Sequence, residues 1–269
     1  MPHLDVVAVQ MAASLDPAEN RDALEALDSI CAGRPHPDLV VLPEAVMRDF
    51  GPPGSDISEF AEDLDGPFVQ RVAELAAKHE VTVVAGMFER SEDASRPFNT
   101  LVVVDPDGLR ATYRKIHLYD SFGYKESERL LAGEPAPVVV EVNGFQVGLM
   151  TCYDLRFPEM ARALVDRGAE VLVVPAAWVA GPHKVAHWRT LLTARAIENT
   201  VYVVAAAQPG PRYSGHSMVV SPRGERIELD EQGEQGGEAT RGMVVSSRVD
   251  REYLDEVRAE NPSLANRRL

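Results

Sequence analysis

Positive charge is scarce in this sequence. Of its 269 residues, 27 are Lys or Arg and 42 are Asp or Glu, which gives a formal net charge of −15. Proteins that bind nucleic acids or anionic membranes take much of their affinity from clustered Lys and Arg side chains. The densest basic run here, residues 110–115, is short. We therefore expect no nucleic-acid partner and no membrane partner.

Cysteine and long apolar runs are also scarce. The longest apolar stretch, residues 171–180, contains Pro175 and is shorter than the roughly 20 residues that span a bilayer. The N-terminal sequence MPHLDVVAVQ lacks the basic lead and the unbroken apolar segment of a signal peptide. We therefore expect a cytoplasmic protein. Its two cysteines, Cys31 and Cys152, are then thiols and each needs its own explanation.

Strand-like segments alternate with segments of helical period, and 45% of the residues are hydrophobic. Strands at residues 5–11, 38–44 and 81–88, separated by helices at 17–32 and 66–79, predict β-α-β units. The first helix has five apolar residues spaced as one buried face: Ala23, Leu24, Leu27, Ile30 and Cys31. Cys31 is therefore predicted to be structural.

The second half of the chain repeats this order. The segment DLVVLPEA matches EVLVVPAA, VVAGMFE matches VVAAAQP, and LVVVDPDG matches SMVVSPRG. Each half also ends in a predicted hairpin, at residues 101–118 and 216–227. The matches predict an internal duplication, with two similar α/β layers face to face and helices outside. Glu44 then aligns with Ala176 and Cys152 with Met11, as expected for an asymmetric site and not for a repeated packing role.

Three residues stand where predicted strands end. Cys152 lies between a strand and a helix that begins near Pro158, where backbone N–H groups lower the pKa of a thiol. Glu44 follows an apolar strand, and Lys115 ends a hairpin strand. Taken singly, each also has a structural explanation: a buried thiol, a solvated carboxylate and an exposed lysine.

Together, the segments LVVLPEAV, TYRKIHLYD and GLMTCYDLRFPE resemble the nitrilase superfamily of carbon–nitrogen hydrolases. The resemblance extends over nearly the whole chain. It implies an α/β fold, a four-layer α-β-β-α sandwich, with a catalytic triad of Glu44, Lys115 and Cys152. Glu126, in GYKESERLLAGE, matches a second glutamate of the family's site. The resemblance also implies a hydrolase domain at residues 1–249 and no metal or organic cofactor. It further implies a homodimer or a higher homo-oligomer, with the C-terminal segment 250–269 at the dimer interface.

These residue types suit the hydrolysis of an amide through a thioester. Cys152 would attack the carbonyl carbon, and Glu44 would transfer the protons. Lys115 and the backbone N–H of Tyr153 would stabilise the oxyanion, and Glu126 would orient Lys115 or the substrate.

The substrate pocket is predicted less directly. We expect Tyr119, Tyr153, Arg156 and Trp178 to line it. Arg156 would either bind a carboxylate at the far end of the substrate or fix the turn through an ion pair with Asp154 or Glu159. His117 is predicted to be structural. His183 and His187 are predicted to lie on a helix surface or to pack in the wall of the site instead of binding zinc.

The segment CYDLRFPE looks most like the amidases of dicarboxylate monoamides and deaminated glutathione. Nitrilases usually place Trp-Glu after the nucleophile, and N-carbamoyl amino acid hydrolases tend to carry two arginines after the following Asp. This chain has Tyr153-Asp154 and Leu155-Arg156, which favours a small aliphatic amide as substrate over these two alternatives. A non-catalytic interaction protein that keeps the fold is an alternative of another class.

Overall fold

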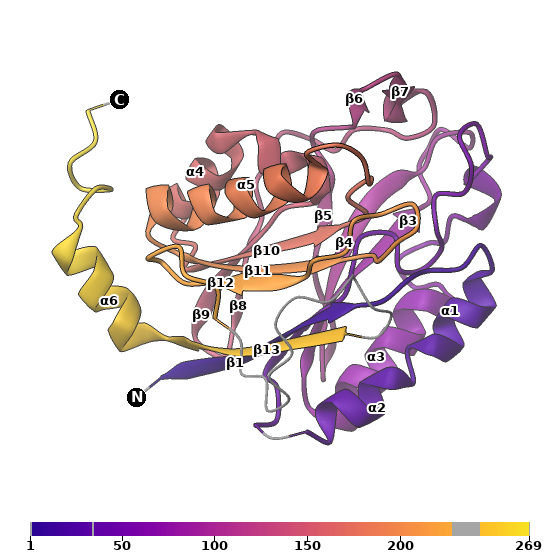
Figure 1. Ribbon diagram of the computed structural model, residues 1–269. Coiled ribbons are helices and arrows are strands. Elements are labelled where there is room, and N and C mark those ends of the chain that lie inside the picture. Colours follow the sequence, from indigo (N-terminus) through magenta and orange to yellow (C-terminus); the bar gives the residue numbers. More distant parts are fainter. Residues whose placement is uncertain (1, 34, 228–242, 269) are drawn as a thin grey trace.

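The computed structural model describes residues 2–33, 35–227 and 243–268. The first half of the chain forms strands and helices in alternation and ends in a β-hairpin (Figure 1). Its elements are β1 (His3–Gln10), α1 (Pro17–Ala23), α2 (Ala26–Cys31), β2 (Leu39–Val41), the 3-10 turn η1 (Ser58–Phe60), α3 (Pro67–His79), β3 (Thr82–Glu89), β4 (Phe98–Asp105) and β5 (Gly108–Arg114).

A short connecting hairpin leads into the second half. It consists of β6 (Asp120–Ser121) and β7 (Tyr124–Lys125), followed by the 3-10 turn η2 (Glu126–Glu128). The second half has the elements β8 (Val139–Val142), β9 (Phe145–Leu149), the 3-10 turn η3 (Cys152–Arg156), α4 (Pro158–Asp166), β10 (Val171–Ala176), α5 (Lys184–Asn199), β11 (Tyr202–Ala207) and β12 (Met218–Val220). The chain then forms β13 (Met243–Asp250) and α6 (Arg251–Glu260).

The strands form two large sheets of similar topology, one with six strands and the other with five among the described residues. One sheet has the order β13-β1-β2-β3-β4-β5 and the other β12-β11-β10-β9-β8. In the first, β1, β2 and β3 are parallel and β4 is antiparallel to β3. In the second, β9, β10 and β11 are parallel and β12 is antiparallel to β11. An antiparallel strand also flanks β1 and β9, as β13 and β8 respectively. This correspondence agrees with the predicted duplication.

The two sheets pack against each other and helices cover their outer faces, which confirms the predicted four-layer arrangement. Figure 1 shows α1, α2 and α3 on one side of the molecule and α4 and α5 on the other. Strands β1 and β2 of the first sheet contact β11 of the second. In the described part of the chain, no helix is both long enough and apolar enough to cross a membrane.

Side chains of one strand point alternately into the two apolar layers of the protein. In β1, Val6 and Ala8 belong to the cluster that also contains the second sheet. Their neighbours Val7 and Val9 belong to the cluster formed with α1, α2 and α3. Because successive side chains of a strand point to opposite faces, β1 contributes to both apolar layers.

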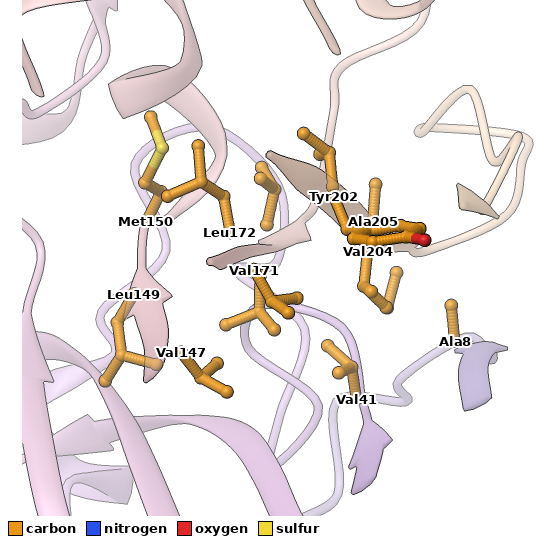
Figure 2. Packing of buried hydrophobic residues seen from close by; sticks show 14 of the residues in the cluster. Ala8, Val41, Val147, Leu149, Met150, Val171, Leu172, Tyr202, Val204 and Ala205 are labelled. Atoms are coloured by element: carbon orange, nitrogen blue, oxygen red, sulfur yellow. The ribbon is translucent and has the colours of Figure 1, made fainter. Parts of the chain in front are cut away.

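The core between the sheets is built mainly from β-branched and other aliphatic residues. Figure 2 shows Ala8 and Val41 of the first sheet in one cluster with Val147, Val171 and Val204 of the second. Each of these five side chains is fully buried. Complete burial of a valine side chain contributes about 1.5–3 kcal/mol, so this layer fixes the two sheets, and the loops at their ends, relative to each other.

The predicted first helix, residues 17–32, is divided into α1 and α2 in the structure. Around the break, the N–H groups of Glu25 and Leu27 donate to carbonyls three residues back, at 3.0 Å each. This tighter turn shifts the helical period. Ala23 is consequently exposed, contrary to the prediction, while Leu24, Leu27 and Cys31 are buried and Ile30 is half-buried.

Three further elements differ from the sequence-based expectation. β8 and β13 were not predicted, and the second hairpin is reduced among the described residues to β12 and a bridge between Val220 and Arg226. The C-terminal segment contains α6, whose Leu254 and Val257 are buried in the same chain. In Figure 1, α6 and the residues after it lie at the periphery of the sandwich. The contact of this segment with a second subunit stays a prediction.

Candidate active site

Four of the predicted site residues meet in one buried group. Glu44 lies in the loop after β2, Lys115 directly follows β5, Glu126 begins η2 and Cys152 begins η3. Their exposed fractions are 1%, 2%, 2% and 8%, respectively. We call these residues the central cluster. Loops from both halves of the chain form it, since Cys152 belongs to the second half and Glu44 and Lys115 belong to the first.

Both carboxylate oxygens of Glu44 are held. Oε1 accepts hydrogen bonds from Asn99 Nδ2 at 2.7 Å and from Lys115 Nζ at 3.0 Å. Oε2 accepts one from the backbone N–H of Ala177 at 2.7 Å. The Gln208 side chain donates to the Glu44 carbonyl at 2.8 Å. Two of these donors, Ala177 and Gln208, follow β10 and β11, so the second half of the chain fixes a side chain of the first.

The loop that carries Glu44 packs directly on β3. A Cβ atom added at Gly86 would lie 2.4 Å from the backbone nitrogen of Ala45 and 2.8 Å from the Cα atom of Glu44. No side chain fits in that space, so glycine at position 86 is required for the Glu44 loop to approach the sheet.

Lys115 joins the two glutamates. Its Nζ atom lies 3.0 Å from Glu44 Oε1 and 2.9 Å from Glu126 Oε2. Burial by itself lowers the pKa of Lys115, but the charges of Glu126 and Glu44 outweigh it and hold that pKa well above its ordinary value. Burial raises the pKa of Glu126, against the opposing charge of Lys115. Lys115 is therefore a permanent cation that stabilises two buried carboxylates.

Cys152 occupies a strained turn between β9 and α4. Its φ angle is +46°, in the left-handed region that is costly for residues other than glycine. Pro158 occupies the first position of α4, where the fixed φ of proline suits a helix start. The strand, η3 and α4 thus present the Cys152 side chain at the end of the sheet, as the sequence predicted from the strand-to-helix pattern.

The surroundings of Cys152 do not lower the pKa of its thiol, contrary to the expectation from the strand-to-helix turn. Burial raises that pKa well above the ordinary value; the charge of Glu44 and a hydrogen bond to Glu44 add to this, and the charge of Lys115 opposes it. A thiol in this setting becomes a nucleophile when a nearby base removes its proton. Glu44 is the neighbouring carboxylate that can do so.

Asp154, which was predicted only as an alternative ion-pair partner of Arg156, fixes the turn through other contacts. It is fully buried, and its Oδ2 atom accepts hydrogen bonds from Tyr113 Oη at 2.6 Å and from the Thr151 N–H at 2.8 Å. Its Oδ1 atom lies 2.7 Å from Nδ1 of His117, whose ring stacks on Phe157 at 3.8 Å. His117 therefore supports the turn, in agreement with its predicted structural role.

The four residues predicted to line the pocket form two groups of contacting side chains. The rings of Tyr119 and Tyr153 meet edge to face, with centroids 5.0 Å apart. The Arg156 guanidinium lies over Trp178, 4.9 Å from the ring centroid. Among the described residues, Arg156 forms an ion pair with neither Asp154 nor Glu159, so the turn-fixing alternative predicted for it does not occur.

Two more residues at the site were missed. Asn99 is fully buried, and its Nδ2 atom lies 2.7 Å from Glu44 Oε1 and 3.5 Å from Glu126 Oε1. Lys184 Nζ donates to Tyr119 Oη at 2.9 Å. Asn99 belongs to no recognisable sequence motif, although it lies near the start of the hairpin that ends at Lys115. Lys184 follows an irregular loop, for which a single sequence gives little guidance.

His183 and His187 pack near the start of α5, with ring centroids 6.4 Å apart. His187 Nδ1 also lies 3.5 Å from an Arg156 nitrogen. Within the described ranges, no group of three or more His, Cys, Asp or Glu side chains is arranged to hold a metal ion. What the central cluster offers is a thiol, a carboxylate within reach of it and a fixed cation, a set suited to covalent catalysis.

Comparison with known proteins identifies the family. The carbon-nitrogen hydrolase family model matches residues 6–259. The chain is 40% identical over 232 residues to a deaminated glutathione amidase of Escherichia coli O157:H7. The matched stretch covers 86% of this chain and 84% of that relative. It is 35% identical over 243 residues to an omega-amidase of Xenopus tropicalis, with 86% of this chain and 83% of the relative covered.

The same family appears among solved structures. XC1258 of Xanthomonas campestris, described as a CN-hydrolase superfamily protein, has a TM-score of 0.86 and 32% identity, covering 100% of this chain and 98% of that one. Nit3 of Saccharomyces cerevisiae, a member of the nitrilase superfamily, has a TM-score of 0.85 and 27% identity, covering 100% of this chain and 97% of Nit3. The chain therefore belongs to the carbon–nitrogen hydrolase family of the nitrilase superfamily and is a carbon–nitrogen hydrolase.

Proposed function

We propose that this protein hydrolyses a small aliphatic amide to a carboxylate and ammonia through a thioester on Cys152. The observation that carries the proposal is the buried contact of Lys115 with both Glu44 and Glu126, beside the Cys152 thiol. Relatives named deaminated glutathione amidase and omega-amidase support the choice of an amide.

In the first half-reaction, Glu44 takes the proton of the Cys152 thiol as the sulfur attacks the carbonyl carbon of the substrate. A C–S bond forms, and the carbonyl π electrons move to the oxygen. When the oxyanion collapses, the C–N bond breaks and Glu44 passes the proton to the departing nitrogen, which leaves as ammonia. The product of this step is an acyl thioester on Cys152.

In the second half-reaction, Glu44 removes a proton from water as the water oxygen attacks the thioester carbon. The C–S bond then breaks, the sulfur recovers the proton from Glu44, and the acid product leaves. One water is consumed, and Glu44 and Cys152 return to their starting states. The hydrogen bonds from Asn99 and Ala177 keep the Glu44 carboxylate in place through both steps.

Lys115 and the backbone N–H of Tyr153 are the proposed donors to the oxyanion. Lys115 is held by Glu44 and Glu126 and keeps its charge, so it needs no reorganisation as negative charge develops on the substrate. A preorganised donor of this kind lowers the barrier by about 3 kcal/mol. In this role Glu126 positions Lys115.

The far end of the substrate is proposed to carry a carboxylate bound by Arg156. The guanidinium is planar and can donate two parallel hydrogen bonds to a carboxylate. Among the described residues it has no acidic partner, and its Cζ atom lies over the Trp178 ring, 4.9 Å from the centroid. A monoamide of a small dicarboxylic acid fits these features.

Ammonia release from a panel of short amides tests the proposal. The wild type should release ammonia, and Cys152→Ala should be indistinguishable from buffer. Cys31→Ala is the matched control, because Cys31 is buried in the apolar cluster formed with α1, α2 and α3, whereas Cys152 belongs to the other large cluster; it should retain the activity. Equal background rates in the wild type and Cys152→Ala would overturn the proposal.

A further inference from the structure

Two cationic side chains lie together at the site. Lys184 is the first residue of α5 and is 8% exposed; Arg156 ends η3. Both lie near the ring of Trp178, with the Arg156 guanidinium carbon at 4.9 Å and Lys184 Nζ at 5.8 Å from its centroid. Burial and the charge of Arg156 both lower the pKa of Lys184, whereas Cys152 acts in the opposite direction. The two cations therefore lie beside the same aromatic ring, and the charge of Arg156 opposes that of Lys184.

Neither cation forms an ion pair with an acidic residue in the described part of the chain. Lys184 Nζ donates to Tyr119 Oη at 2.9 Å and lies over the rings of Phe122 and Tyr119, at 4.1 and 5.1 Å. The Nε atom of Arg156 is buried without a hydrogen-bond partner. The chain has 42 acidic and 27 basic residues, so its composition does not explain why these two side chains lack a carboxylate.

The aromatic rings explain how the unpaired ammonium is tolerated. Each ring face attracts a cation, and the Tyr119 hydroxyl accepts a hydrogen bond from it. Tyr119 is itself fixed to the central cluster, since its backbone N–H donates to Glu126 Oε2 at 2.6 Å. Lys184 is therefore held at a defined position relative to Glu126 and Lys115, as a residue that selects a substrate must be.

We infer that Lys184 is a specificity-determining residue that, with Arg156, binds the terminal carboxylate of the substrate. This inference rests on the proposed function and deepens it, because it assigns the recognition of the carboxylate to two cations from different elements. The Arg156 guanidinium can approach one oxygen edge of the carboxylate, and the Lys184 ammonium can donate to the same group from α5. The bound carboxylate removes the repulsion between the two cations. Amides that lack it leave that repulsion in place and are selected against.

Paired substrates of equal length test the role of Lys184. Glutaramate carries a terminal carboxylate, and pentanamide is its neutral counterpart. In Lys184→Met the ratio of kcat/KM for glutaramate to that for pentanamide should fall about tenfold or more, equivalent to about 1.4 kcal/mol. Lys184→Arg, which keeps the charge, should recover most of the ratio. An unchanged ratio in Lys184→Met, with the fold intact by circular dichroism, would overturn the inference.

Lys125→Met is the matched control for a lost lysine. Lys125 lies in β7 with its side chain 68% exposed, 3.7 Å from Glu128. Its substitution should leave the glutaramate-to-pentanamide ratio at the wild-type value.

A binding measurement separates this inference from the proposed function. Glutarate, a dicarboxylate, is titrated calorimetrically into Cys152→Ala and into the Cys152→Ala/Lys184→Met double variant. About tenfold weaker binding to the double variant supports the role of Lys184, even if the wild type hydrolyses no amide and the proposed function fails. Equal binding to both variants, or no binding to Cys152→Ala, contradicts the inference, even if amides are hydrolysed.

Discussion

Replacing Lys115 by Met removes the positive charge that the central cluster is built around. Methionine keeps an unbranched stem of similar length, so the change acts mainly on charge. In the wild type, Lys115 Nζ lies 3.0 Å from Glu44 and 2.9 Å from Glu126, and both the lysine and the glutamate side chains are 2% exposed. The substitution therefore leaves two buried carboxylates with no counter-charge.

The expected cost follows from that burial. Breaking a buried ion pair by removing one partner typically destabilises a protein by about 3–5 kcal/mol. For a chain of this size, each kcal/mol lowers Tm by roughly 2–4 °C. Loss of an oxyanion donor should separately lower kcat by about 10²–10³-fold. Lys115→Met should thus fold with a clearly reduced Tm and have little activity.

The loss of stability in Lys115→Met should depend on pH, because it leaves Glu126 buried without the charge of Lys115. Burial already raises the pKa of Glu126 above its ordinary value of 4.5, and Lys115 opposes the rise; without Lys115 the pKa rises further. At a pH between the ordinary pKa of Glu126 in the unfolded state and its raised pKa in the folded variant, the folded state keeps a proton that the unfolded state has released. The stability of the variant therefore falls as pH increases. The Tm deficit of Lys115→Met should therefore be larger at pH 8 than at pH 5.

Thermal unfolding followed by circular dichroism measures this deficit. Lys125→Met is the control, with an expected change within about 0.5 kcal/mol because its side chain is exposed. Adding Glu126→Gln to Lys115→Met should recover part of the lost stability, because one of the two stranded carboxylates becomes neutral. A deficit that is independent of pH, or that Glu126→Gln increases, would refute the reasoning.

Three other substitutions test single contacts. Glu44→Gln should lower the pKa of Cys152, because Glu44 raises it; the thiolate absorbance, with Cys152→Ser as blank, should appear at lower pH, and an upward shift would contradict this. Asn99→Leu should lower kcat about tenfold with little change in KM, since Glu44 Oε1 loses its 2.7 Å hydrogen bond; a loss of Tm alone would indicate a structural role only. Arg156→Leu should raise KM for glutaramate at least tenfold more than for pentanamide, and an equal rise for both would count against carboxylate binding.

The sequence contained enough information for the layers of the fold because most of their strands and helices carry a local signal. Val6 to Val9 alternate between two apolar faces, and α3 has one apolar face. β13 gave no such local indication. It is stabilised by pairing with β1, in which Asp250 lies opposite His3, and a contact between residues so far apart is not visible in either segment alone.

The site residues also divide into those that local sequence signals predicted and those that they did not. Glu44, Lys115 and Cys152 each closely follow a regular strand, so the duplication and the motifs predicted their convergence. Lys184 lies after a loop that ends at His183, whose φ is +63°, and neither periodicity nor charge pattern predicts that path. The position of Asn99 between two glutamates depends on packing between β4 and the loops above it, which only the three-dimensional structure specifies.

The central claim is that Cys152 carries the acyl group. Wild-type protein is mixed with glutaramate, quenched in acid during turnover, and digested for mass spectrometry. We predict that the peptide containing Cys152 gains the mass of the substrate minus ammonia, and that the peptide containing Cys31 does not. Steady ammonia release with Cys152 unmodified at every quench time, together with full activity of Cys152→Ala, would contradict the thioester mechanism.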